Sequence, residues 1–385
     1  MKFTVEKTLD GSLARTGTLE TPHGVIQTPV FMPVGTQGSV KTVAPWELKE
    51  LGSEIILGNT YHLHVRPGDE LIKQMGGLQK WTAWNGPMLT DSGGYQAYSL
   101  GETRGHKSAA TSEEGVRFYS HIDGKKLFFT PENVLDMQAA LGSDIAMVLD
   151  DCPPLTMQDK EGAEVTVTKE RVESAVNRTK DWAERTIKYW QQKSYGEYSN
   201  AIFGIVQGGL YEDLRLKALE DIQSLPFDGI AVGGVAIESE GKDKINQAVK
   251  FVADKLDKKR PHYLMGVGEP EDLIRMVNLG IDMFDCVIPT RYGRHGSFWT
   301  GENFQRESIS LSKYINDPKP LDFNCQCKIC RTFSTSYLRH LFMAGEFLAG
   351  RALVYHNLYT LLNLMSEIRR TIDDGSFKEK YSRFL

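Results

Sequence analysis

Residues 201–235 read AIFGIVQ GGL YEDLRLKALEDIQS LPFD GIAVGGV, and the fold can be argued from this stretch. The short apolar runs 201–207 and 229–235 predict strands that are buried on both faces. The intervening segment 211–224 has the pattern of a helix. Units of this kind, in which a helix separates two buried strands, are typical of α/β folds.

The same alternation continues in both directions along the chain. Starts such as Thr130-Pro131-Glu132 place a proline at the first helical position and an acid in the first turn. The predicted strands are 30–34, 54–59, 87–92, 144–151, 201–207, 229–235, 262–267 and 283–288, and the predicted helices include 131–141, 168–193, 211–224, 242–255 and 270–279.

Eight buried strands that alternate with helices predict an α/β fold, the (β/α)8 TIM barrel. A doubly wound open sheet is the alternative, but it rarely needs eight such units, and no Gly-x-Gly-x-x-Gly follows the first strand. Residues 1–29 are broken by Asp10-Gly11 and Pro22-His23-Gly24, which predicts an N-terminal antiparallel β piece that could plug the bottom of the barrel. After the eighth strand, 297–333 is polar and rich in loops.

The composition is that of an ordinary globular protein. Of its 385 residues 41% are hydrophobic, and the formal charge of −5 argues against a protein coated in basic residues without excluding a local basic face. No N-terminal stretch combines a basic start with an apolar core, and no run approaches the roughly 20 apolar residues of a membrane span. We expect a cytoplasmic protein with no membrane contact.

Polar residues gather at the predicted strand ends, which form the catalytic face of such a barrel. Asp91, Asp150 and Gln207 end three strands, and Asp285 lies inside an apolar run, where an unused charge costs several kcal/mol. An acid at a strand end is often a helix cap, so Asp91 has an ordinary reading as well. Asp285 has little structural use, and it therefore predicts an active site.

Two arginines, Arg291 and Arg294, follow that strand on what we interpret as a glycine-containing turn. Guanidinium groups bind phosphates and base edges through paired hydrogen bonds. A buried acid beside two cations indicates a site that handles a nucleotide.

Cys325-x-Cys327-x-x-Cys330 is a cluster that suggests metal before disulfide in a cytosolic chain. With His356 it provides three thiolates and an imidazole, which predicts one closed, structural zinc site. His340 is also within plausible reach, and three buried free thiols are the plain alternative. We expect a single catalytic domain over 1–385 with a zinc-binding subdomain at 297–356 inserted after the eighth strand.

Several strings carry a resemblance to a known family. They are Gly58-Asn-Thr-Tyr-His-Leu63, Leu89-Thr-Asp-Ser-Gly-Gly-Tyr-Gln96, Gly204-Ile-Val-Gln-Gly-Gly209, Ala231-Val-Gly-Gly234, Tyr263-Leu-Met-Gly-Val-Gly268, Phe284-Asp-Cys-Val-Ile-Pro-Thr-Arg291 and the Cys-x-Cys-x-x-Cys…His set. Over almost the whole chain, the sequence resembles the queuine tRNA-ribosyltransferases, or tRNA-guanine transglycosylases. The resemblance implies a zinc-containing barrel that exchanges the wobble guanine of G-U-N anticodon tRNAs for a 7-deazaguanine base. It also implies a homodimer in which one subunit helps to hold the tRNA.

The resemblance also implies roles for single residues. Asp285 matches the nucleophile that forms a covalent ribosyl-aspartate, and Asp91 matches the general acid/base. The base pocket would be made by Asp91, Ser92, Gly93, Gly94, Tyr95, Asp150, Gln207, Gly234, Val235 and Met265, with Cys152 and Val34 as further lining. The tRNA anticodon stem-loop would be contacted by Gly266, Val267, Gly268, Glu269, Pro270, Glu271 and Asp272, and by Thr290, Arg291, Tyr292, Gly293 and Arg294. Trp84, Phe333, Tyr337 and His340 are candidate dimer-interface residues.

The sequence departs from the family at the segment that meets the incoming base. Val235 stands where bacterial members usually carry leucine, and either Glu238 or Glu240 could take the role of the family's glutamate. The choice between the aminomethyl-deazaguanine precursor and queuine therefore stays open. Tyr95 could equally be a core residue.

Two other functions compete: a non-catalytic RNA-binding partner subunit, against which the retained acids argue, and a barrel glycosidase, which would not explain the cysteines or the paired arginines.

Overall fold

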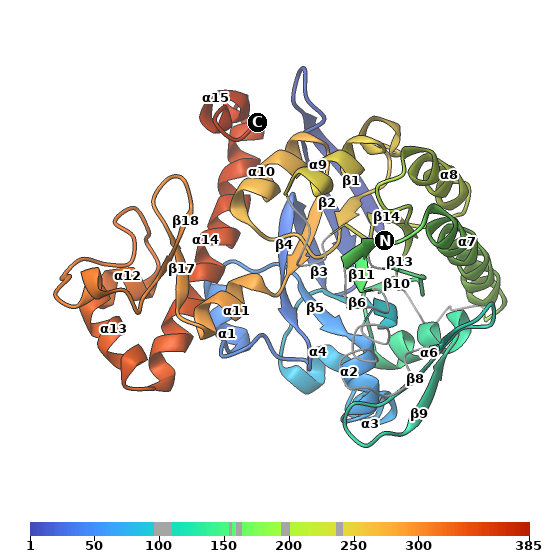
Figure 1. The fold of residues 1–385 in the computed structure, drawn as a ribbon, viewed down its shortest axis with the longest axis horizontal. Coiled ribbons are helices and arrows are strands. Elements are labelled where there is room, and N and C mark those ends of the chain that lie inside the picture. Colours follow the sequence, from blue (N-terminus) through green and yellow to red (C-terminus); the bar gives the residue numbers. More distant parts are fainter. Residues whose placement is uncertain (96–109, 154–155, 159–163, 194–200, 236–241) are drawn as a thin grey trace.

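A closed barrel of parallel strands forms the centre of the molecule in this computed structural model, which describes residues 1–95, 110–153, 156–158, 164–193, 201–235 and 242–385. The strands run in the order β10-β13-β14-β15-β16-β4-β5-β6 around the barrel, which confirms the predicted fold class (Figure 1). Their bounds are β4 Val30–Gly35, β5 Ile56–Asn59, β6 Met88–Asp91, β10 Ile145–Met147, β13 Ala201–Val206, β14 Gly229–Val232, β15 His262–Leu264 and β16 Met283–Cys286.

Helices cover the outside of the barrel. The predicted helix at 131–141 is confirmed residue for residue as α6, because Thr130 caps it through its side chain and Gly142 ends it in the left-handed conformation. The helices are α1 Pro45–Glu50, α2 Thr60–Val65, α3 Asp69–Gln74, α4 Gly77–Thr82, α6 Pro131–Leu141, α7 Lys169–Gln192, α8 Glu212–Gln223, α9 Lys242–Lys250, α10 Pro270–Asn278, α11 Ile288–Arg294, α12 Lys328–Thr332, α13 Thr335–Met343, α14 Phe347–Asp373 and α15 Phe377–Tyr381, with 3-10 turns at Ala253–Lys255 and Ser312–Tyr314.

An antiparallel sheet of β1 Lys2–Thr8, β2 Arg15–Thr21 and β3 Gly24–Thr28 confirms the predicted N-terminal piece. It is tied to the bottom of the barrel, where the strands begin. Arg15 donates to both carboxylate oxygens of Asp282, one residue before β16, at 3.0 and 2.6 Å. Both partners are buried, and a buried ion pair of this kind needs the good geometry that the two bonds supply. The sheet thus closes the end opposite the candidate site.

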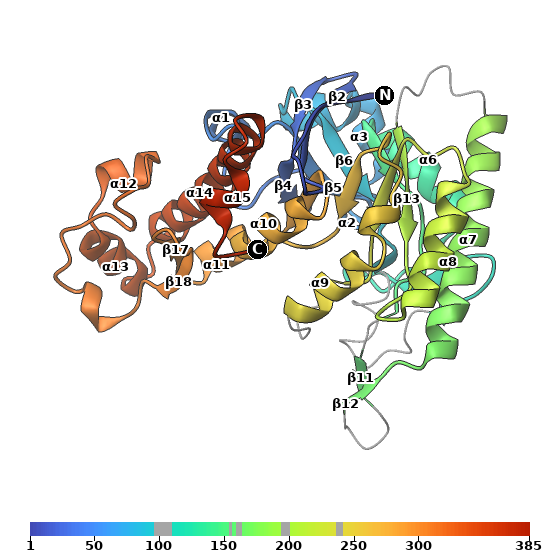
Figure 2. The same cartoon turned by 90° about the horizontal axis from the view of Figure 1, so that it is seen from above.

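The C-terminal part forms a lobe on one side of the barrel. Figures 1 and 2 show α12, α13 and the hairpin of β17 Ser297–Thr300 and β18 Gln305–Ser308 in this lobe, with α14 between it and the barrel. Two core clusters meet on α14: Leu361 and Ile368 pack into the barrel core, and Leu353 and Leu358 pack into the core of the lobe. A single 27-residue helix therefore joins the two parts.

Some elements differ from the sequence-based expectation. The eighth strand ends at Cys286, and Ile288 begins α11, so Arg291 and Arg294 lie on a short helix and not on a turn. Local pattern could not show this, since Pro289 suits the first turn of a helix as well as the end of a strand. The structure also adds a three-stranded sheet of β7 Ala110–Thr111, β8 Val116–Tyr119 and β9 Lys126–Phe129, and a hairpin of β11 Thr156–Gln158 and β12 Glu164–Thr166. In the part of the chain that is described, no helix is long and apolar enough to cross a membrane.

Candidate active site

Asp285 lies on β16 near the C-terminal end of the barrel. Its Oδ1 accepts hydrogen bonds from the Tyr263 hydroxyl at 2.6 Å and from the Gly266 backbone N–H at 2.8 Å. Burial raises the pKa of Asp285, and these two bonds oppose the rise. Within the described residues no hydrogen bond is made to Oδ2. One oxygen is thus anchored and the other can react.

Tyr263 is a candidate functional residue that the sequence pattern did not single out. It lies on β15 beside β16, and its side chain is 1% exposed. A signal was present in the sequence, because a tyrosine inside a buried strand has to find a partner for its hydroxyl. Only the folded barrel shows that this partner is Asp285.

Asp91 lies on the same mouth of the barrel, at the end of β6. Its carboxylate accepts from the Asn59 amide at 2.5 Å and from the Thr60 backbone N–H at 3.0 Å. Burial raises the pKa of Asp91 to about 7, and the negative charge of Asp285 adds to the rise, so the two acids are close enough to interact. A carboxyl group with this pKa can both give and take a proton at neutral pH.

Asp150 and Gln207 are held together in the same mouth. The Gln207 Nε2 atom donates to Asp150 Oδ2 at 2.6 Å, and both side chains are buried. Burial raises the pKa of Asp150 to about 6. A Cβ built on Gly234 would lie 2.4 Å from Gln207 Oε1 and 3.8 Å from Cys152 Sγ, so these three residues surround one small space.

The segment from Ser92 to Tyr95 lies against Asp150. A Cβ on Gly94 would come within 3.1 Å of the Asp150 carbonyl oxygen, and Gly93 has a φ of +75° in close contact with Tyr61. Ser92 Oγ accepts from the Gly94 N–H at 3.3 Å. Tyr95 is 42% exposed, so it is not a core residue. Of the other predicted lining residues, Val34 and Val235 are buried and Met265 is half-buried.

The residues predicted to contact RNA adjoin the ends of β15 and β16. Glu269 is the N-cap residue of α10, and its two oxygens accept from the Tyr292 hydroxyl at 2.7 Å and from the Trp299 indole N–H at 3.3 Å. These bonds tie α11 to the loop before α10. Of the two arginines on α11, Arg291 is half-buried and Arg294 is exposed.

The remaining residues of the predicted RNA-contact set pack within the protein or pair with it. A Cβ on Gly293 would lie 2.4 Å from the Val354 nitrogen, because α11 packs tightly on α14, and Gly268 is equally close to Cys286. Val267, Pro270 and Thr290 are buried, Gly266 donates to Asp285, and Glu271 and Asp272 form ion pairs with Arg275.

A group of possible metal ligands lies in the lobe. The Sγ atoms of Cys325, Cys327 and Cys330 are 3.5, 3.7 and 3.3 Å from His356 Nδ1. Ligands of a tetrahedral zinc ion, with sulfur at about 2.3 Å and nitrogen at about 2.0 Å, lie about 3.6 Å apart, so the donor set fits such an ion. His356 Nε2 is 2.8 Å from the Trp299 carbonyl oxygen, which leaves Nδ1 for the metal. His340 is not part of the group.

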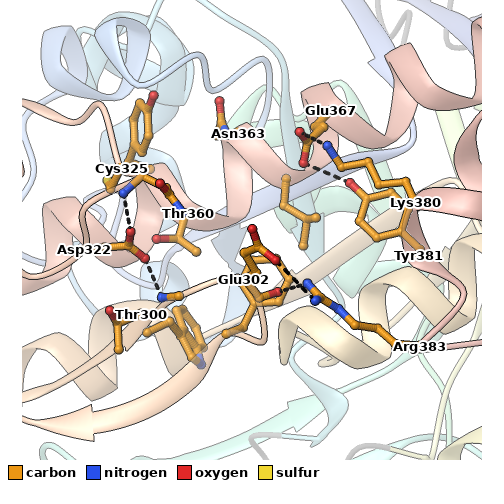
Figure 3. A pocket seen from close by; sticks show the side chains of 16 residues that line it. Thr300, Glu302, Asp322, Cys325, Thr360, Asn363, Glu367, Lys380, Tyr381 and Arg383 are labelled. Atoms are coloured by element: carbon orange, nitrogen blue, oxygen red, sulfur yellow. Dashed lines mark hydrogen bonds and ion pairs between the residues drawn. The ribbon is translucent and has the colours of Figure 1, made fainter.

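Cys325 is the most exposed of the four possible ligands. Figure 3 shows it on the wall of a cavity of about 400 Å³ that α14 and the C-terminal segment also line. Four of the charged groups drawn there form ion pairs, Glu367 with Lys380 and Glu302 with Arg383, and Asp322 accepts from the backbone N–H groups of Gly301 and Asn324. Two lysines near the cysteines are paired as well, Lys313 with Glu307 and Lys328 with Glu50. Acidic side chains thus neutralise the charges of both lysines.

Comparison with known proteins decides the family. A family model described as queuine tRNA-ribosyltransferase matches residues 10–385. The chain belongs to the queuine tRNA-ribosyltransferase family. The queuine tRNA-ribosyltransferase of Caldanaerobacter subterraneus is 46% identical over 385 residues, covering 100% of this chain and 97% of the relative. That of Halalkalibacterium halodurans is 45% identical over 97% of this chain and 94% of its own length, and that of Janthinobacterium is 45% identical over 100% and 98%.

Family membership agrees with the resemblance read from the sequence motifs. The barrel brings the predicted acids Asp91, Asp150 and Asp285 to one mouth, and it holds the four predicted metal ligands in a separate lobe. Glu238 and Glu240, the two alternatives for the family's glutamate, lie outside the described residues. The rest of the segment 236–240, which we expect to meet the incoming base, also lies outside the described residues.

The raised pKa of Asp91 has a measurable consequence for stability. The folded-state pKa of Asp91 is about 7 and exceeds the ordinary value. The contribution of Asp91 to the free energy of unfolding is therefore fully present at acid pH and is lost as pH rises toward 7. As pH rises from 5 to 7, the free energy of unfolding should therefore fall less steeply in Asp91→Asn than in the wild type. The difference in slope should be up to about 1.4 kcal/mol per pH unit. Urea unfolding at several pH values measures this. The exposed Asp254, changed to asparagine, should keep the wild-type slope, and equal slopes in all three proteins would contradict the prediction.

Proposed function

We propose that this protein is a tRNA-guanine transglycosylase that exchanges the wobble guanine of G-U-N anticodon tRNAs for a 7-deazaguanine base on the way to queuosine. The observation that carries the proposal is the pair Asp285 and Asp91 at one mouth of the barrel: one carboxylate with a free oxygen, and one carboxyl with a pKa of about 7. The membership of the chain in the queuine tRNA-ribosyltransferase family supports the same reaction.

In the first half of the reaction, Asp285 acts as the nucleophile. Its Oδ2 attacks C1′ of the target ribose, and an ester bond forms as the bond from C1′ to the guanine nitrogen breaks. Asp91, protonated before this step, gives its proton to the departing guanine. The hydrogen bonds from Tyr263 and Gly266 hold the carboxylate in place through Oδ1 and leave Oδ2 for attack.

In the second half, the direction of proton transfer reverses. Asp91, now ionised, takes the proton from the nitrogen of the incoming base, and that nitrogen attacks C1′. The ester bond breaks and returns the Asp285 carboxylate. Two inversions at C1′ give net retention, as in retaining glycosidases.

Recognition of the base is assigned to Asp150, Gln207 and Gly234. Asp150 accepts from the N1–H and the exocyclic amine of a guanine edge, and its pKa of about 6 leaves it mainly ionised at neutral pH. The Gly234 backbone N–H and the Gln207 side-chain amide donate to O6 of the base. In this structure Gln207 Nε2 donates to Asp150 Oδ2. A bound base replaces part of this hydrogen bonding with its own contacts to the two side chains. Tyr95, exposed at the mouth, stacks on the base once the anticodon loop has released it.

We further propose that the metal is a single structural zinc ion held by Cys325, Cys327, Cys330 and His356. Such an ion supplies folding energy by cross-linking its ligands. It would join the loop before α12 to α14, which itself packs on the barrel. This supports a single catalytic domain at 1–385 with a zinc-binding subdomain at 297–356.

The tRNA and a second subunit complete the proposal. Arg291 and Arg294 contact the bases that flank the target, and α11 holds both. For the homodimer, Tyr337 is exposed and stacks near Phe333 with ring centroids 5.4 Å apart, which suits an interface. Trp84 was a wrong candidate, because it is 1% exposed and donates its indole N–H to the Pro87 carbonyl.

Labelled guanine tests the proposed exchange. The wild-type protein should incorporate it into an unmodified tRNA with a G-U-N anticodon, because the same pocket accepts guanine as leaving and as entering base. A matched tRNA whose wobble guanine is replaced by adenine should take up no label. Absence of label from the G-U-N tRNA would contradict the proposal. Competition of the aminomethyl precursor and of queuine against guanine then identifies the preferred incoming base.

A further inference from the structure

Arg215 is a fully buried arginine directly behind the base pocket. It lies in the first turns of α8 and is 0% exposed. The helix α8 lies on the outside of the barrel (Figure 1). The Arg215 guanidinium donates to four backbone carbonyls: Gly209 at 2.8 Å, Val206 at 3.0 Å, Gly233 at 2.8 Å and Gly234 at 3.3 Å. A buried charge is costly unless its donors are satisfied, and here backbone oxygens satisfy them.

The four carbonyls belong to the last residue of β13, Val206, and to two neighbouring loops. One follows β13 and carries Gln207, and the other follows β14 and carries Gly234. A single guanidinium therefore fixes both loops that are assigned to the base. Gly208 lets the backbone of α8 approach the loop after β13, since its φ is +134° and a Cβ there would lie 2.7 Å from the Arg215 backbone nitrogen.

The hydrogen bond to the Gly233 carbonyl also orients the next N–H group. In a planar trans peptide the C=O and the following N–H point in opposite directions. Because Gly233 O faces Arg215, the Gly234 N–H faces away from it, and a Cβ built on Gly234 would lie beside Gln207 Oε1 and Cys152 Sγ. In the part of the chain that is described, this N–H donates to no protein atom. It is left for a ligand.

We propose that Arg215 is a positioning residue that sets the preference of the pocket for an oxygen at position 6 of the base. Through the Gly233 and Gly234 carbonyls it holds the Gly234 N–H toward O6 of guanine or of a 7-deazaguanine. It touches neither the base nor the ribose. This inference rests on the proposed function, because it concerns how that reaction selects its base.

The test compares base analogues in the labelled-guanine assay. The analogue 6-thioguanine keeps N1–H and the amine but replaces O6 by sulfur, a weak acceptor, and hypoxanthine keeps O6 but lacks the amine. In Arg215→Lys the preference for guanine over 6-thioguanine should fall about fivefold, the weight of one neutral hydrogen bond. The preference for guanine over hypoxanthine, which depends on Asp150, should stay unchanged, and KM for guanine should rise with little change in kcat.

The control and the contrary outcomes are distinct. Arg260 donates to the carbonyls of Leu225 and Gln223 at the opposite end of the barrel, so Arg260→Lys should leave both preferences as in the wild type. If Arg215→Lys does not fold, Arg215→Gln, which keeps a donor without a charge, is measured in the same way. Unchanged preferences in the folded Arg215 variant would overturn this inference alone. Absence of guanine exchange by the wild type would overturn the proposed function and the inference with it.

Discussion

Asp285→Asn should lower guanine exchange at least about 10³-fold and leave the protein folded, because an amide cannot form the ester with C1′. The wild-type protein, mixed with tRNA and denatured, should retain a covalent tRNA adduct that the variant lacks. The asparagine can still accept from Tyr263 and Gly266 through its carbonyl oxygen, so the local geometry is preserved. Initial rates of label uptake and a denaturing gel measure the two effects.

Asp228→Asn provides the matched control. Asp228 lies one residue before β14, at the opposite mouth of the barrel, where it accepts from the Ile202 N–H at 3.0 Å, and burial raises its pKa as well. The Asp228→Asn variant should exchange guanine at the wild-type rate. Near-normal activity of Asp285→Asn, or an adduct in that variant, would refute the assignment of Asp285 as the nucleophile.

Cys327→Ser should reduce bound zinc from about one per chain to well below one and lower the melting temperature by about 5–10 °C. A structural zinc site contributes several kcal/mol of folding free energy, and Cys327 is a buried member of the ligand set that also accepts from the Cys330 N–H. Metal analysis after dialysis and a thermal scan measure the content and the stability. A chelator should produce the same loss of stability in the wild type.

Cys152→Ser is the matched control for the metal. Cys152 is also a free cysteine, but it lies beside the base pocket and outside the metal group. Its serine variant should bind as much zinc as the wild type. Full zinc content in Cys327→Ser would show that the ligand set is wrong.

Elements whose pattern is local could be predicted directly from the sequence. The helix 131–141 could be predicted because its cap, its N1 proline and its final glycine are all within the segment. The eight strands were recognisable as apolar runs, although the structure trims most of them; the run 144–151 is a strand only at Ile145–Met147. The end of the eighth strand was misplaced, because the α11 helix forms by packing on α14, far away in sequence.

Residue types and spacing alone determined that this chain has two acids at the ends of predicted strands and a third inside one, a Cys3His set and the motifs of its family. Only the tertiary structure decided how those groups are tuned. Three features depend on residues that are distant in the chain. They are the pKa of Asp91 near 7, the hydrogen bond from Tyr263 to Asp285, and the hydrogen bonds from Arg215 to two glycine-containing loops. The physical reason is that burial and hydrogen bonding depend on which surfaces meet in the closed barrel, and a linear pattern carries no such information.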